Sequence, residues 1–118
     1  HMASHDALSH LPNRMLFQDR LHQSLAQCER HGAQGALLLL DLDSFKEIND
    51  TLGHAIGDEL IKGVAKRLQT HIKDSDTVAR LGGDEFAVIL EDVGSPDNIA
   101  SAAQRILDSL AQPFSFEE

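Results

Sequence analysis

The sequence predicts an α/β fold, in which a small and at least partly antiparallel sheet is covered by helices. Apolar or β-branched runs at residues 36–40, 77–81 and 86–90 are typical of short strands. Stretches with apolar residues at helical spacing alternate with these runs. Gly82 and Gly83 lie between the last two runs, where a hairpin turn needs glycine.

Composition is that of one globular domain. The 118 residues leave room for one core, and 42% hydrophobic with 25% charged residues argues against disorder. No apolar run could span a bilayer and no secretory signal is visible, so we expect no membrane segment and a cytoplasmic location, with the parent protein free to be membrane-anchored. The single cysteine, Cys28, fits a reduced compartment.

The net charge of −9 argues against binding of long nucleic acid, which requires a basic face. An acidic site can still hold a phosphorylated small molecule when divalent cations lie between the carboxylates and the phosphates. His1 and Met2 are typical of a cleaved expression tag. We therefore assign residues 1–5 to tag and linker, and residues 6–118 to the domain.

The first element is predicted to be a helix over residues 7–30, with one apolar face formed by Leu16, Phe17, Leu21 and Leu25. Gly32 follows where a helix C-cap is expected. The unbroken apolar run at residues 36–40 then predicts a strand buried on both faces.

Two aspartates, Asp41 and Asp43, end this strand. Asp43 is interpreted as the N-cap of the next helix. Asp41 is poorly explained in that way, because a carboxylate at the end of a buried strand is costly unless it is paired or bound to a metal ion.

The middle of the chain predicts a short helix at residues 44–50, a loop at 51–58 and a long helix at 58–72. Asp58 is open to two interpretations at this point, a helix cap or a ligand-binding group. Residues 73–76 are polar and turn-like, and lead into the hairpin.

The hairpin places Asp84 and Glu85 beside its two glycines. One interpretation is a solvated acidic turn. The other combines this turn with the acid at the first strand's end, since carboxylates shared by two divalent cations are typical of phosphoryl-transfer sites. The chain then predicts a helix at residues 97–111, and residues 114–118 could begin another strand.

Residues 82–86 read GGDEF, letter for letter the signature of the GGDEF family of diguanylate cyclases. The similarity extends over DALSHLPNR at 6–14, DLDSFKEIND at 41–50 and GHAIGD at 53–58. Several spaced motifs agree in order, so the chain resembles this family from residue 6 to about residue 113. The resemblance implies a ferredoxin-like sheet, like the palm of polymerases and nucleotidyl cyclases, and condensation of two GTP into cyclic di-GMP with release of pyrophosphate.

The resemblance also implies residue roles. Asp41, Asp84 and the Leu42 carbonyl would hold Mg²⁺ or Mn²⁺, and Asp84 or Glu85 would help remove the proton from the ribose 3′-hydroxyl. Lys46 would stabilise phosphate charge, although a solvated lysine is the alternative.

The same resemblance assigns a nucleotide pocket. Asn49 and Asp58 would read the guanine edge, because a carboxylate can accept from guanine N1 and N2, which adenine cannot offer. His54 would line the pocket, unless it is a loop histidine without a ligand. The remaining implied contacts with the substrate are those of Phe45, Gly82 and Gly83. The two glycines would let the backbone lie against the phosphates.

Catalysis in this family implies a homodimer in which each subunit binds one GTP. The resemblance also implies a parent protein with fused sensor or phosphodiesterase domains.

Many members carry an inhibitory Arg-x-x-Asp motif, and the matching residues here are Lys73 and Asp76. We expect weak product inhibition, because lysine lacks the forked contacts of arginine. The family's last strands and closing helix are not in this sequence, so we expect its C-terminal part to be missing and its activity to be reduced. A non-catalytic GTP-binding regulatory module and a structural dimerisation domain are the alternative functions.

Overall fold

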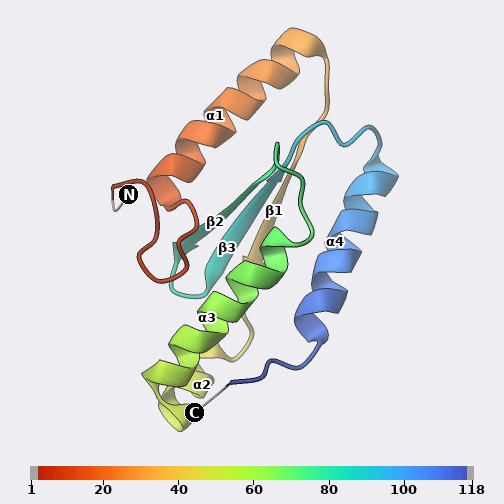
Figure 1. The fold of residues 1–118 in the computed structure, drawn as a ribbon. Helices are drawn as coiled ribbons and strands as arrows, with labels where there is room; N and C mark the ends of the chain where they lie inside the picture. The colour runs from red at the N-terminus through yellow and green to blue at the C-terminus, as the bar shows by residue number, and fades with distance from the viewer. Residues whose placement is uncertain (1–2, 117–118) are drawn as a thin grey trace.

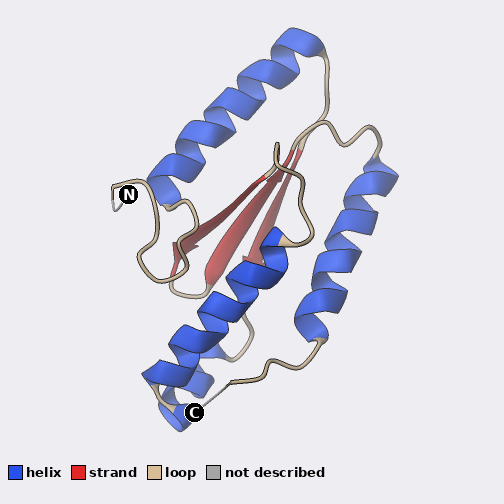
Figure 2. Ribbon diagram, in the orientation of Figure 1, coloured by secondary structure: helices blue, strands red, loops and turns tan. Residues whose placement is uncertain are grey.

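The computed structural model describes residues 3–116 and shows one sheet with helices on both faces (Figures 1 and 2). In chain order the elements are α1 (Arg14–His31), β1 (Ala36–Asp41), α2 (Phe45–Leu52), α3 (His54–Gln69), β2 (Thr77–Gly82), β3 (Glu85–Leu90) and α4 (Pro96–Ala111). Within these residues the strands are arranged in the order β1-β3-β2, and both pairings are antiparallel. The predicted α/β class, the three strands and the hairpin are confirmed.

The core has two layers, one on each face of the sheet, because successive strand residues point to opposite sides. Phe86, Val88 and Leu90 of β3 face α3 and α4, whereas Ala87 and Ile89 face α1. Figure 1 shows the same division, with α1 on one side of the sheet and α3 and α4 on the other. From the helices, the main core contributors are Ile61, Val64, Ala65, Leu68, Ala102, Ile106 and Phe17.

The expectation that the first strand is buried on both faces is wrong. Burial alternates along β1, where Leu38 and Leu40 pack on the α3–α4 side while Leu37 is 43% and Leu39 69% exposed. The cause is the position of β1 at the edge of the described sheet, whereas α1 packs mainly on β2 at the opposite edge. The two exposed leucines therefore form an uncovered continuation of the face that α1 buries.

This alternation predicts opposite responses from neighbouring residues of β1. Leu39→Lys should change the free energy of unfolding by less than about 0.5 kcal/mol, as is usual at exposed sites. Leu38→Lys should destabilise by about 2–5 kcal/mol, because it removes packing and forces an ammonium group toward the core. Urea unfolding of both variants measures the difference. Equal losses would contradict the alternation.

The first helix begins later than predicted. Residues 7–13 form a turn instead, closed by a bridge between His5 and Pro12 and by hydrogen bonds from Ser9 to the Asp6 carboxylate. His10 has φ 64°, which a helix does not allow. Asn13 then caps α1 by accepting from the Leu16 amide, 3.1 Å away.

The predicted apolar face of this helix is only partly right. Phe17 is buried and Leu21 partly so, but Leu25 is 53% exposed. Ser24 takes the inner position and donates to Glu91 Oε1 at 2.6 Å. Gly32 is the left-handed C-cap, as predicted.

The region predicted as a loop is largely helical. Only Gly53, with φ 93°, separates α2 from α3, so Asp58 lies inside α3 and is not its cap. Asp43 is not a cap either, because Ser44 holds the N-cap position of α2 without a side-chain hydrogen bond. The long helix thus starts four residues earlier than predicted and ends at Gln69.

Arg67 fixes the segment after α4. Its guanidinium donates to the carbonyls of Ser109 and Gln112, both at 2.7 Å, and of Pro113, and lies 3.5 Å from the centre of the Phe114 ring. Residues 114–116 form no strand, and residues 1–2 and 117–118, which include the expected tag residues, lie outside the described part.

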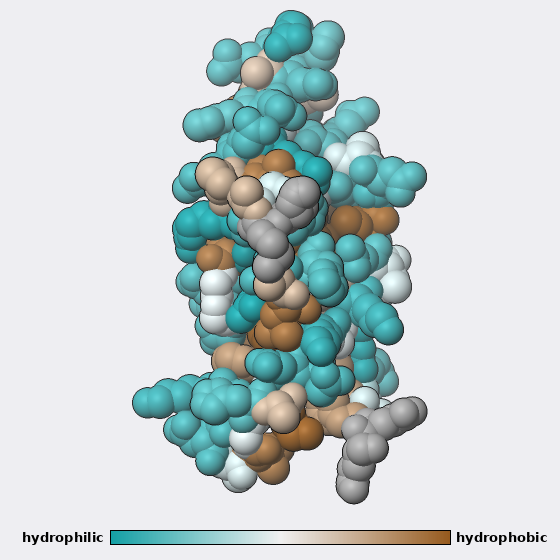
Figure 3. Space-filling model, turned by 60° about the vertical axis from the view of Figure 1, so that its left-hand side comes forward, coloured by the Kyte–Doolittle hydropathy of each residue, from teal (hydrophilic) through white to brown (hydrophobic). Residues whose placement is uncertain are grey.

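The surface of the α1 side is mainly hydrophilic, with small hydrophobic patches that are separated from one another (Figure 3). Within residues 3–116, the helices lack the length and hydrophobicity that crossing a bilayer demands.

Candidate functional site

The two acidic clusters predicted from the sequence meet at one end of the sheet. Asp41 and Glu85 lie directly opposite each other in the β1–β3 ladder. Just beyond this pair, the Leu42 amide donates to the Asp84 carbonyl at 3.1 Å. The antiparallel register therefore brings the end of β1 and the tip of the β2–β3 hairpin together.

The donors at this end suit a hard divalent cation. Asp41 is exposed, Asp84 half-buried, and both present carboxylate oxygens, the ligands that Mg²⁺ prefers. In residues 3–116 no three acidic, histidine or cysteine side chains gather as a complete cage. Magnesium does not require one, since it usually keeps several waters and binds one or two carboxylates together with substrate phosphates. The residues present fit such a partly hydrated ion.

The hairpin tip depends on its glycines. Gly82 has φ 149° and Gly83 has φ 49°, and the ladder shifts register between Arg80 and Gly82. Both glycines are exposed, and no heavy atom lies within 4 Å of a Cβ built on either. The tip thus offers bare backbone next to Asp84, as close approach of a phosphate would require.

Glu85 has a partner in the structure. Its carboxylate lies 3.7 Å from the Arg14 guanidinium, and both side chains are more than half exposed. A pair so open to solvent holds Glu85 only weakly. Its carboxylate is therefore accessible to other partners.

The predicted guanine-reading residues lie on the α2–α3 pair, which follows β1 at the same end of the sheet (Figure 1). His54 and Asp58 are exposed and one turn apart on α3, so they share a face. Asn49 of α2 points at α3: its Oδ1 is buried without a hydrogen-bond partner, and a Cβ at Gly57 would lie 1.7 Å from it. Gly57 is therefore the residue that lets Asn49 pack against α3.

The two other predicted residues of α2 differ in role. Phe45 is half-buried and packs against the main core, so it anchors the start of the helix. Lys46, in the first turn, is exposed. This exposure allows its ammonium group to contact an anion, and it is also what a solvated surface lysine would show.

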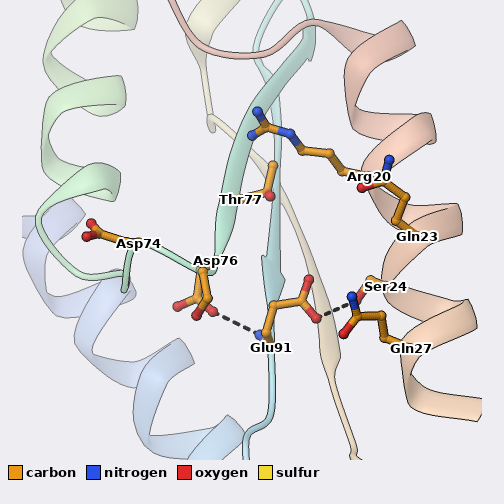
Figure 4. Close-up of a pocket in the computed structure, with 9 residues that line it drawn as sticks. Arg20, Gln23, Ser24, Gln27, Asp74, Asp76, Thr77 and Glu91 are labelled. Atoms are coloured by element: carbon orange, nitrogen blue, oxygen red, sulfur yellow. Dashed lines mark hydrogen bonds between the residues drawn. The ribbon is translucent and has the colours of Figure 1, made fainter. Parts of the chain in front are cut away.

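Lys73 and Asp76 are engaged in structural contacts. Asp76 is 8% exposed and accepts from the amides of Lys73 at 2.9 Å and Glu91 at 2.8 Å. Lys73 Nζ donates to the Glu91 carbonyl at 3.1 Å. Figure 4 shows Asp76 and Glu91 beside a hollow of about 390 Å³ next to α1, where Ser24 donates to Glu91. The expected weak product inhibition remains a prediction.

Two residues without a role predicted from the sequence, Arg80 and Asp6, connect the hairpin tip to the N-terminal turn. Arg80 donates to the Gly83 carbonyl and to Asp6, which comes from the N-terminal turn. Asp6 opens the matched motif at 6–14 and Arg80 lies two residues before the motif at 82–86, but no local pattern pairs positions so far apart.

Comparison with known proteins gives consistent matches. A family model described as "Diguanylate cyclase, GGDEF domain" matches residues 3–118. The chain is 46% identical over 113 residues to diguanylate cyclase TpbB of Pseudomonas aeruginosa, covering 96% of this chain and 26% of that protein. It is 43% identical over 113 residues to the bifunctional diguanylate cyclase/cyclic di-GMP phosphodiesterase MucR of the same species, covering 96% of this chain and 16% of that protein.

Solved structures agree. A sensory box/GGDEF family protein from Caulobacter crescentus superimposes with a TM-score of 0.92 at 41% identity, over 97% of this chain and 74% of that one. The chain thus spans about a quarter or less of the curated relatives described above, and about three quarters of this crystallised chain.

Proposed function

Because this chain belongs to the GGDEF domain family, whose members include diguanylate cyclases, we propose that it forms one half of a site that condenses two GTP molecules into cyclic di-GMP and releases pyrophosphate. The observation that carries the proposal is the convergence of Asp41, Glu85 and the Asp84–Leu42 contact at one sheet end. A solvated acidic turn has no need of a second acid placed opposite it.

The side chains would divide the work as follows. Asp41, Asp84 and the Leu42 carbonyl would hold Mg²⁺ or Mn²⁺. Bound there, the cation would lower the pKa of the attacking hydroxyl and offset the charge on the phosphates. Asp84 or Glu85 would accept the ribose 3′-hydroxyl proton, and Lys46 would lie against the phosphates.

Guanine would be recognised on the α2–α3 side. The Asp58 carboxylate would accept from guanine N1 and N2, while His54, one turn away, would line the same face. Since Asn49 Oδ1 faces α3, its NH₂ group is the end that would donate to the base. Phe45 would support this pocket from the core, and the backbone of Gly82 and Gly83 would border the phosphates.

A single domain supplies one substrate and one set of acids, so two copies would have to face each other for each 3′-hydroxyl to meet the opposite α-phosphate. Turnover should then rise more steeply than linearly with protein concentration. The whole protein would carry further domains, a proposal supported by the low coverage of the relatives and by the phosphodiesterase named in MucR.

Incubation with GTP and Mg²⁺, followed by chromatography for cyclic di-GMP, tests the proposal. Formation of product that stops on chelation with EDTA and resumes with Mg²⁺ is expected. GTP binding without product, at concentrations that permit dimers, would instead support a non-catalytic regulatory module. Absence of both binding and product would overturn the proposal.

A further inference from the structure

We propose that Asp6 and Arg80 are positioning residues that fix the Gly83–Asp84 turn, and so couple the N-terminal segment to the candidate metal site; the second part rests on the proposed function. Arg80 lies between Asp6 and Gly83 and binds both. Its Nε and Nη2 donate to the Gly83 carbonyl at 3.0 and 2.8 Å, and its Nη1 to the Asp6 carboxylate oxygens at 3.2 and 3.1 Å. One guanidinium thus joins residues that are 77 positions apart.

The ion pair is shielded, unlike that of Arg14 and Glu85. The side chains of Arg80 and Asp6 are only 14% and 22% exposed. Hydrogen bonds between charged groups, here partly removed from solvent, are stronger than neutral ones. Burial alone would raise the pKa of Asp6. The hydrogen bonds from Ser9, the hydrogen bonds from Arg80 and the positive charge of Arg80 outweigh this effect and hold the pKa of Asp6 below its ordinary value. Asp6 is therefore an anion at neutral pH.

The other side of Asp6 is held by the N-terminal turn. Ser9 donates to Asp6 Oδ2 through its amide and its hydroxyl, both at 2.8 Å. The Asp6 amide donates to the carbonyl of Leu11, which is 1% exposed in the core. The Arg80 amide donates to the Pro12 carbonyl at 3.1 Å, so a backbone hydrogen bond also holds the N-terminal turn against β2. Displacement of this turn would therefore move Asp6 relative to Arg80.

The carbonyl that Arg80 holds belongs to the residue before Asp84. Gly83 has no side chain to restrict its own dihedral angles, so the turn takes its geometry from outside contacts. Two are present, from Arg80 to the Gly83 carbonyl and from the Leu42 amide to the Asp84 carbonyl. Asp84 lies between these anchors, and loss of the first would free one side of the turn.

Two variants break the connection in different ways. Asp6→Asn keeps a side chain that can accept from Ser9 but removes the charge. Arg80→Lys keeps the charge, but a single ammonium group cannot reproduce the fork that reaches Gly83 and Asp6 together. Arg67→Lys is the matched control, because it weakens a comparable arginine cluster at the end of α4, away from the hairpin.

The experiment measures ¹⁵N relaxation of the backbone and, separately, binding of Mn²⁺ alone. We expect order parameters at Gly83 and Asp84 to fall from about 0.85 to below about 0.6 in both variants, and Mn²⁺ affinity to fall about fivefold, with neither changing in Arg67→Lys. Unchanged order parameters in both folded variants would overturn the positioning role. Unchanged Mn²⁺ affinity, where Asp84→Asn lowers it, would overturn the coupling. If Asp84→Asn also left Mn²⁺ binding intact, the metal site itself would fail, and the relaxation data would still decide the positioning role.

Discussion

Replacing Asp84 with asparagine should lower the rate of cyclic di-GMP formation by about 1000-fold or more. Asparagine has the same shape, so the turn should keep its hydrogen bond from Leu42, which uses the backbone carbonyl. The loss arises from the charge, because a cation held by carboxylates contributes several kcal/mol to phosphoryl transfer, and each 1.4 kcal/mol is a factor of ten in rate. Steady-state turnover in Mg²⁺ and in Mn²⁺ measures the effect.

Glu47→Gln is the control for this experiment. Glu47 is also an exposed acid near the same end of the sheet, in the first turn of α2, but the proposed site does not include it. Its replacement removes an equal charge and should alter turnover by less than about threefold, as expected for a screened surface charge. Equal losses in the two variants would mean that overall charge, and not a metal ligand, matters at this end of the sheet.

Replacing Phe86 with alanine should destabilise the domain by about 3–5 kcal/mol, the usual loss for a buried phenylalanine. Phe86 is 0% exposed and among the largest fully buried side chains, and it packs in the layer between the sheet and α3–α4. Since a domain is stable by only about 5–15 kcal/mol, much of the protein should be unfolded at 37 °C. Urea unfolding at 15 °C and at 37 °C measures this.

Phe86→Leu separates packing from chemistry. The last residue of the GGDEF signature directs its side chain into the core, whereas the acids before it lie at the tip. Leucine keeps the residue apolar, so the variant should lose less stability than alanine and retain turnover within about threefold below its unfolding temperature. A leucine variant that is stable but inactive would show that Phe86 contributes directly to the reaction.

The local signals in the sequence were sufficient for the strands, the hairpin and helices α3 and α4. Alternation and apolar spacing are properties of short segments, and turn chemistry at Gly82 and Gly83 added the connection. What failed depended on tertiary contacts. The exposure of Leu39 depends on which strand α1 packs against, and Gly57 lies inside α3, where the lack of a side chain leaves space for Asn49.

The candidate site shows the same division. Asp41 could be singled out because a carboxylate that ends an apolar strand is costly unless it is paired or metal-bound. Asp84 could be singled out because the GGDEF hairpin adds two adjacent acids to its two glycines, and the structure brings the two segments together. Their roles remain predictions. The contact between Asp6 and Arg80 could not be predicted, because it spans 74 positions and each residue alone reads as an ordinary polar group.

The direct pairing of Asp41 with Glu85 restricts how this part of the chain can change in length. Side chains alternate with a period of two, so one residue inserted in the middle of β3 would turn Phe86, or the residues after it, toward the wrong face. An insertion in the loop after Leu90 would leave the residues of β3 on their present faces. Natural variation in length should therefore accumulate at the α4 end of the sheet, while the acidic end keeps a fixed spacing.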